Sequence, residues 1–96
     1  MNYHFIVKPE AEEDIKSAFD WYEEQQTGLG DSFIDEVDLA FNQILNSPKS
    51  YQERYKKSRI NFTNRFPFGV HYSIEESRIV VLAVLHTSKD PKNWRE

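Results

Sequence analysis

Cysteine is absent from this 96-residue sequence, so neither a disulfide nor a thiolate-bound metal can support the fold. A chain of this length can instead bury one hydrophobic core, and we expect a single domain spanning residues 1–96. Long apolar runs are also missing: none approaches the roughly 18 residues of a membrane span, and the N-terminus lacks the basic and apolar segments of an export signal. These absences predict a soluble, cytoplasmic protein that does not enter a membrane.

The usual signatures of bound cofactors are missing as well. The sequence contains no phosphate-binding glycine loop, and no group of Asp, Glu or His residues has the spacing expected of metal ligands. We therefore expect neither a cofactor nor a metal. Any chemistry that the protein performs must come from its ordinary side chains.

Positive charge is scarce in the first half of the chain and concentrated in the second. Residues 1–48 hold two lysines and eleven acids, whereas residues 49–96 hold ten Lys and Arg and five acids. The halves carry charges of −9 and +5, which sum to the net −4 of the whole chain. Such polarisation predicts a basic working surface on the C-terminal half and acidic, solvated helices before it.

The stretch from Lys57 to His86 has the pattern of three consecutive strands and holds most of the residues capable of chemistry. In its middle part every second residue is apolar, which predicts a strand with one face toward the core. The apolar positions are Phe66, Phe68, Val70, Tyr72 and Ile74. The other face of this strand is free for function.

The pairing of these strands can be predicted because residues directly opposite each other project to the same face. Apolar residues meet when Phe62 lies opposite Phe66 and Ile60 opposite Phe68. The face away from the core then carries Lys57, Arg59, Asn61, His71, Ser73 and His86. This register predicts a group of basic and histidine side chains on one surface.

The last strand, residues 79–85, is apolar at every position, which is typical of a strand inside a sheet. Setting Glu75 opposite Arg78 across the preceding turn aligns Val70 with Ala83. The second face of this strand would then carry Val80, Leu82 and Val84 among basic residues. An exposed apolar patch with a charged rim is typical of a docking surface.

The first half of the chain predicts a strand and two helices. Alternation over residues 3–8 indicates a strand, and Pro9 then begins a helix that runs to about Gln26. A short link containing two glycines leads to a second helix, which ends before Pro48. We therefore predict an α+β fold in which an N-terminal strand, an antiparallel helical hairpin and three antiparallel strands form a mainly antiparallel sheet, with the helices on one face.

This order of elements, together with three segments, resembles the RelE/ParE superfamily of toxins from type II toxin–antitoxin modules. The segments are residues 8–15 (KPEAEEDI), 65–72 (RFPFGVHY) and 84–86 (VLH), the last followed by Asp90-Pro91 and Trp94. The resemblance implies a growth-inhibiting toxin of the plasmid-stabilisation type. It also implies that a cognate antitoxin neutralises the toxin through protein–protein contact. Homo-oligomerisation stays open at this point.

The superfamily divides by mechanism, and the resemblance implies three alternatives. ParE-like members bind DNA gyrase, and residues 65–72 and 89–94 look more like that branch. RelE-like members are metal-independent, ribosome-dependent endonucleases that cleave mRNA; here their catalytic candidates are His86, Arg65 and His71. An inactive relative that only binds an antitoxin is the third alternative.

The expected binding residues are Lys57, Arg59, Lys89, Val80, Leu82, Val84 and Trp94. Some of the candidates also have plainer interpretations. His71 in mid-strand is more often a surface histidine than a base, and Arg65 can simply shape the hairpin turn. Phe66, Phe68 and Tyr72 are expected to lie in the core.

Overall fold

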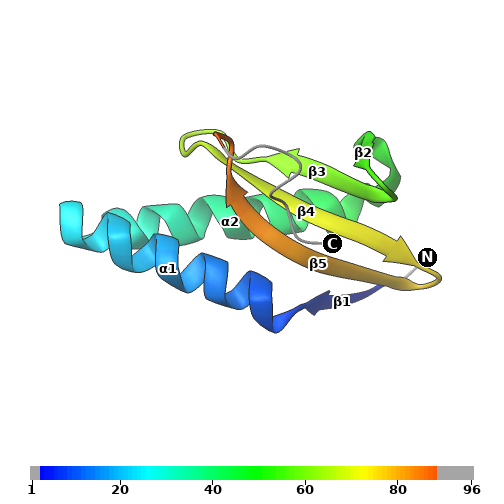
Figure 1. The fold of residues 1–96 in the computed structure, drawn as a ribbon, viewed down its shortest axis with the longest axis horizontal. Coiled ribbons are helices and arrows are strands. Elements are labelled where there is room, and N and C mark those ends of the chain that lie inside the picture. Colours follow the sequence, from blue (N-terminus) through cyan, green and yellow to red (C-terminus); the bar gives the residue numbers. More distant parts are fainter. Residues whose placement is uncertain (1–2, 89–96) are drawn as a thin grey trace.

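A five-stranded sheet with two helices on one face forms the structure, a computed structural model that describes residues 3–88 (Figure 1). The elements are β1 (His4–Val7), α1 (Pro9–Gln25), α2 (Leu29–Asn46), the 3-10 turn η1 (Pro48–Ser50), β2 (Glu53–Tyr55), β3 (Ser58–Phe62), β4 (Phe68–Glu75) and β5 (Arg78–His86). The strand order is β1-β5-β4-β3-β2, and only β1 and β5 are parallel. The predicted α+β fold and the internal position of the last strand are confirmed.

The helical hairpin is closed by one carboxylate and one close backbone approach. Glu23 near the end of α1 accepts hydrogen bonds from the backbone N–H groups of Gly28 (2.9 Å) and Gly30 (3.0 Å), which satisfies donors at the start of α2. Gly28 has a φ of +91°, a conformation that favours glycine. A Cβ at Gly30 would lie 2.8 Å from both the Glu23 carboxylate and the Phe19 ring. A side chain at Gly30 would therefore require the Glu23 carboxylate and the Phe19 ring to shift.

Aromatic rings from both helices and the sheet meet in the core. Tyr22 of α1 and Phe33 of α2 lie with their centroids 5.5 Å apart. Phe66 lies 4.8 Å from Tyr22, and Phe68 lies 5.0 Å from Phe33, in edge-to-face arrangements. These contacts fix the helical hairpin against the start of β4.

The predicted register of β3 and β4 is wrong by three residues. Phe62 pairs with Gly69 and Arg59 with Tyr72, because the connection is a five-residue loop, residues 63–67. An odd shift exchanges the faces, so Arg59 and Asn61 lie on the helix side and not beside His71. Asn61 is buried there, and its amide donates to the carbonyl of Ala40 in α2 (3.1 Å). Polar contacts with the helical layer thus replace the predicted apolar match.

The predicted register of β4 and β5 is correct only as far as Tyr72 and Val81. An unpaired residue, Leu82, forms a bulge, after which each partner is shifted by one. As a result Val84 joins the core and is 1% exposed, so its predicted place on the outer patch is wrong. His86 pairs with Phe68 on the helix side, not with His71 on the opposite face. A period of two cannot reveal an inserted residue of this kind.

Because of the bulge, we expect a charged substitution to lower the free energy of unfolding more at Val84 than at Leu82. Val84→Asp should destabilise the fold by more than about 3 kcal/mol, because it places a carboxylate in the core. Leu82→Asp should cost about 1 kcal/mol, because Leu82 is only half-buried in the bulge. Urea unfolding of both variants measures the difference. Equal losses, or a larger loss for Leu82→Asp, would contradict the bulged register.

Candidate functional site

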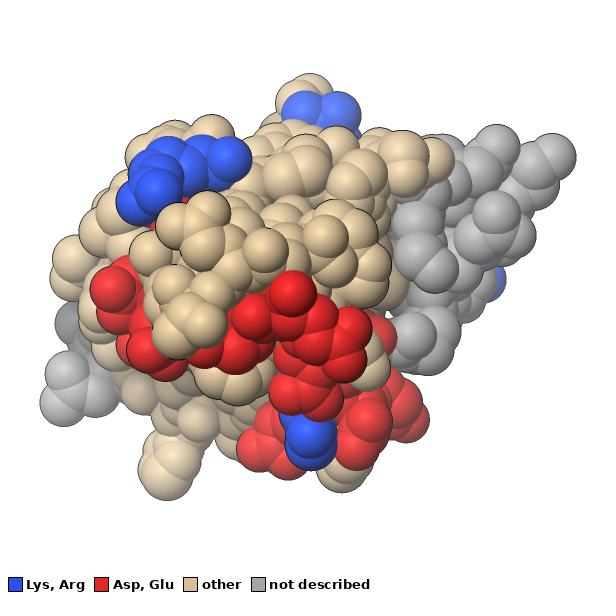
Figure 2. All heavy atoms as spheres, turned by 90° about the vertical axis from the view of Figure 1, so that its left-hand side faces the viewer, with Lys and Arg blue, Asp and Glu red and all other residues tan. Residues whose placement is uncertain are grey.

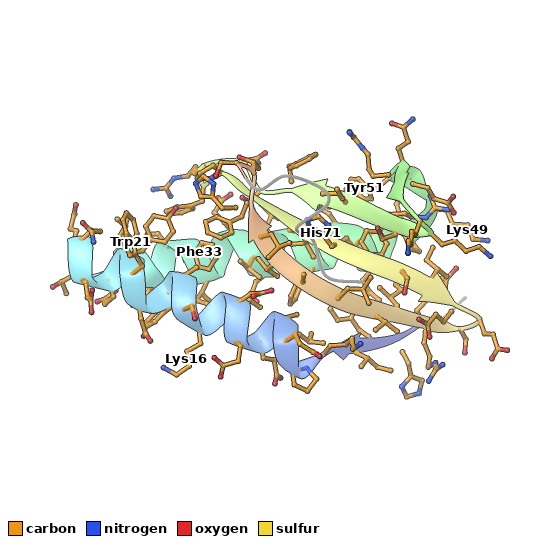
Figure 3. The ribbon with its side chains drawn as sticks, viewed as in Figure 1. Lys16, Trp21, Phe33, Lys49, Tyr51 and His71 are labelled. Carbon is orange, nitrogen blue, oxygen red and sulfur yellow. The ribbon has the colours of Figure 1, made fainter. Side chains whose placement is uncertain are left out.

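The outer hairpin of the sheet forms a basic edge, defined here as Lys49, Arg54, Lys56, Lys57 and Arg59. It is built from η1, β2, β3 and the turn between the two strands, which carries Lys56 and Lys57, and the first four of these residues are exposed. Figure 3 places Lys49 and Tyr51 at the end of the molecule opposite Trp21. The predicted binding residues did not include Lys49, Arg54 or Lys56, and strand β2 was not predicted. Five basic residues and one acid within residues 49–59 were the available signal.

Arg59 holds the basic edge together from within. Its guanidinium donates to the carbonyl oxygens of Tyr51 (2.5 Å) and Lys49 (3.4 Å) and lies 3.5 Å from the Glu53 carboxylate. The side chain is 20% exposed. Its donors thus point at oxygen atoms of this chain, so Arg59 anchors the backbone of the segment that carries Lys49.

Tyr72 attaches the same segment to the core. Its hydroxyl donates to the carbonyl oxygen of Pro48 at 2.6 Å, and its ring lies against Tyr51 with centroids 6.5 Å apart. Burial raises the pKa of Tyr72 to about 12, and the positive charge of Arg59 opposes that rise. The neutral phenol is therefore the form that the fold stabilises.

Arg65 lies at the other end of the sheet, in the loop of residues 63–67. One oxygen of Glu36 in α2 accepts hydrogen bonds from the backbone N–H groups of Asn64 (3.1 Å) and Arg65 (3.2 Å). The exposed guanidinium of Arg65 lies over the Phe66 ring, 5.6 Å from its centroid. The loop that carries Arg65 is thus clamped to α2.

His86 lies near this loop, and the backbone N–H of Thr87 donates to the carbonyl of Pro67 (2.8 Å). The backbone N–H of Ser88 donates to Nδ1 of His86 (3.1 Å), and the Ser88 hydroxyl lies 2.8 Å from the same nitrogen. A backbone N–H can only donate, so the neutral ring carries its proton on Nε2. In this arrangement His86 offers a donor to solvent and no free base.

Of the three catalytic candidates, His71 lies apart from His86 and Arg65. His71 is 4% exposed and pairs with Ile60 and Ala83 on the sheet face away from the helices, whereas His86 lies on the helix side. Among the predicted binding residues, Lys57 is exposed, Val80 is buried and Leu82 is half-buried. Lys89 and Trp94 lie outside the described residues. Of the residues predicted for the site, Lys57 and Arg59 both belong to the basic edge.

Acidic side chains occupy the helical layer, and Figure 2 shows a band of them across one end of the molecule. Within residues 3–88, no group of three or more His, Asp or Glu side chains has the geometry to hold a metal ion. In the same range, neither helix is long and apolar enough to cross a membrane.

The chain matches one family model and resembles a solved structure. A family model described as "ParE toxin of type II toxin-antitoxin system, parDE" matches residues 5–91. A solved chain of the chromosomal ParDE TA system from P. aeruginosa has a similar structure, with a TM-score of 0.80 and 12% identity. That match covers 90% of this chain and 97% of the other. No curated protein matches the sequence.

Tyr72 predicts how stability depends on pH. Because the folded-state pKa is raised above the usual value of about 10, the contribution of the buried phenol is complete below about pH 10 and is lost as the pH rises to about 12. The free energy of unfolding should fall in this interval by up to about 1.4 kcal/mol per pH unit. Urea unfolding of the wild type and Tyr72→Phe measures this. A slope that is the same in both proteins would exclude Tyr72 as its source.

Proposed function

Because the chain belongs to the ParE toxin family of type II toxin–antitoxin systems, we propose that it inhibits growth by binding its target, with DNA gyrase as the family precedent. We also propose that a cognate antitoxin neutralises it. The observation that carries the binding mechanism is the basic edge, where exposed cations surround an anchoring Arg59. The same surface offers a partner charge and shape without any catalytic group.

The positions of the histidines support binding over catalysis. A general base needs a free nitrogen close to the proton it removes, and a cation nearby to stabilise the developing charge. His71 is buried on one sheet face, and Nδ1 of His86 is engaged by Ser88. Arg59, one of the expected binding residues, turns toward carbonyl oxygens of its own chain.

A ribosome-dependent, metal-independent nuclease stays as the second candidate, for one reason. His86 and Arg65 lie on neighbouring segments at one end of the molecule, which the hydrogen bond from Thr87 to Pro67 holds together. Both side chains are exposed, so both are accessible to a bound RNA. An inactive antitoxin-binding relative is the third candidate.

The chemistry of the basic edge indicates what the antitoxin should present. Strand β2 is the outermost strand of the sheet, with β3 on its inner side. An extended or helical segment that carries acidic residues would meet Arg54 and Lys57 here, and the acids would offset their charge. Its apolar residues would meet Phe62, which is 46% exposed beneath the Arg54 guanidinium. We propose that Val80 and Leu82 extend this contact.

Inducing the protein alone in bacteria tests the proposed function. We expect growth arrest with DNA-damage signalling and intact messages. Reversing two charges of the basic edge, with Arg54→Glu and Lys57→Glu, should weaken the arrest and also antitoxin binding by at least about ten-fold. Lys16→Glu, which reverses a charge on α1, is the matched control and should leave both unchanged.

Other outcomes would select the other candidates. Cleaved messages whose appearance depends on His86 or Arg65 would contradict gyrase-type binding and favour the nuclease. Normal growth at full expression of folded protein would favour the inactive relative. An arrest that the double charge reversal leaves at full strength would remove the basic edge from the mechanism.

A further inference from the structure

A groove runs between α1 and the C-terminal end of β5, at the end of the molecule away from the basic edge. It consists of two adjoining cavities of about 310 and 230 Å³, which share Ala18, Phe68 and His86 as lining residues. Asp14 and Ser17 line one cavity, and Trp21 lines the other. Figure 3 places Trp21 on the same side of the molecule as Phe33, far from Lys49.

The walls of this groove are shaped for a large apolar side chain. Trp21 is 57% exposed although its ring packs edge-on against Tyr22, with centroids 5.1 Å apart. The His86 ring lies against Phe68 on the other side, at 5.4 Å. Ala18, a small and buried residue, lines both cavities. One side chain inserted here would cover the indole and make ring contacts on both walls.

The charge of the groove indicates which residues should accompany that side chain. Asp14, Ser17, Ala18 and Trp21 form one stripe of α1 at helical spacing, and Glu10 and Glu24 continue it at either end. The single basic residue of α1, Lys16, is paired with Asp20 at 3.0 Å. Among the described residues that line the groove, Asp14 is the acidic one, and its Oδ2 accepts the backbone N–H of Val84 at 3.0 Å. A partner in the groove therefore lies beside the acidic residues of α1, which favours positive charge on the partner.

His86 supplies the hydrogen bond that a polypeptide would use. Its Nδ1 is held by the backbone N–H of Ser88, so Nε2 presents a donor. A backbone carbonyl is the acceptor that every peptide carries. The groove thus offers aromatic rings for an apolar side chain, a hydrogen-bond donor for a backbone carbonyl, and nearby acidic residues for a basic side chain.

We infer that this groove binds a polypeptide segment in which a large apolar residue is flanked by lysine or arginine. The apolar residue lies between Trp21 and His86, and the cations lie along the acidic stripe of α1. The basic edge prefers an acidic partner, so the two surfaces require segments of opposite charge. The inference therefore stands apart from the identity of the toxin's target.

Peptide titration of the isotope-labelled full chain, followed by NMR, tests this inference. The indole N–H signal of Trp21, assigned by its absence from Trp21→Phe, reports occupation of the groove. The probes are acetyl-Arg-Phe-Arg-amide, acetyl-Arg-Ala-Arg-amide and acetyl-Glu-Phe-Glu-amide. We expect the first to shift the signal and saturate, with binding about five-fold weaker for the alanine peptide and at least about ten-fold weaker for the acidic peptide.

Two protein variants complete the test. Ser17→Phe places a ring in the groove at an exposed position and should weaken binding of acetyl-Arg-Phe-Arg-amide by at least about ten-fold. Glu12→Phe places the same ring on the opposite side of α1 and should leave the affinity within about two-fold. Amide spectra establish that both variants are folded. An indole signal that no peptide moves, equal affinity for all three peptides, or equal effects of the two variants would overturn the inference.

Discussion

The contact of four aromatic rings between the helical hairpin and the sheet is the interaction on which the rest of the structure depends. Tyr22 and Phe33 come from the two helices, and Phe66 and Phe68 come from the loop before β4 and from β4 itself. Segments separated by about thirty to fifty residues meet at this point, so burial of the rings offsets the entropy of closing the chain. The groove lies directly beside the same rings.

The acidic first half and the basic second half of the chain form two different surfaces in the fold. The acidic half of the chain forms the helical layer, and five basic residues of the second half gather at η1, β2 and β3. Arg59 and Tyr72 give this basic edge a fixed shape, since each bonds to a carbonyl oxygen of the segment that carries Lys49. The backbone of this segment is therefore held in place before a partner binds, which lowers the entropy cost of ordering it on association.

Local periodicity was sufficient to predict the helices, the strands β1, β3, β4 and β5, and the internal position of β5, but it did not predict the short strand β2. It could not predict contacts between distant segments. The Asn61 amide donates to the carbonyl of Ala40, and the Glu36 carboxylate binds the loop before β4. These contacts accompany a β3–β4 register that the matching of apolar residues does not predict. The unpaired Leu82 then moves Val84 and His86 to the other face. For the site, Lys57 was predicted as a surface cation, whereas the anchoring role of Arg59 required the fold.

The free energy of unfolding of Phe33→Ala, with Phe62→Ala as the matched control, tests most directly whether the fold depends on the aromatic rings. Phe33 is fully buried among the rings, whereas Phe62 is 46% exposed at the other surface of the sheet. Urea unfolding should show a loss of about 3–5 kcal/mol for Phe33→Ala and less than about 1 kcal/mol for Phe62→Ala. Similar losses for the two variants, or a loss below about 1 kcal/mol for Phe33→Ala, would contradict the central role of the aromatic rings.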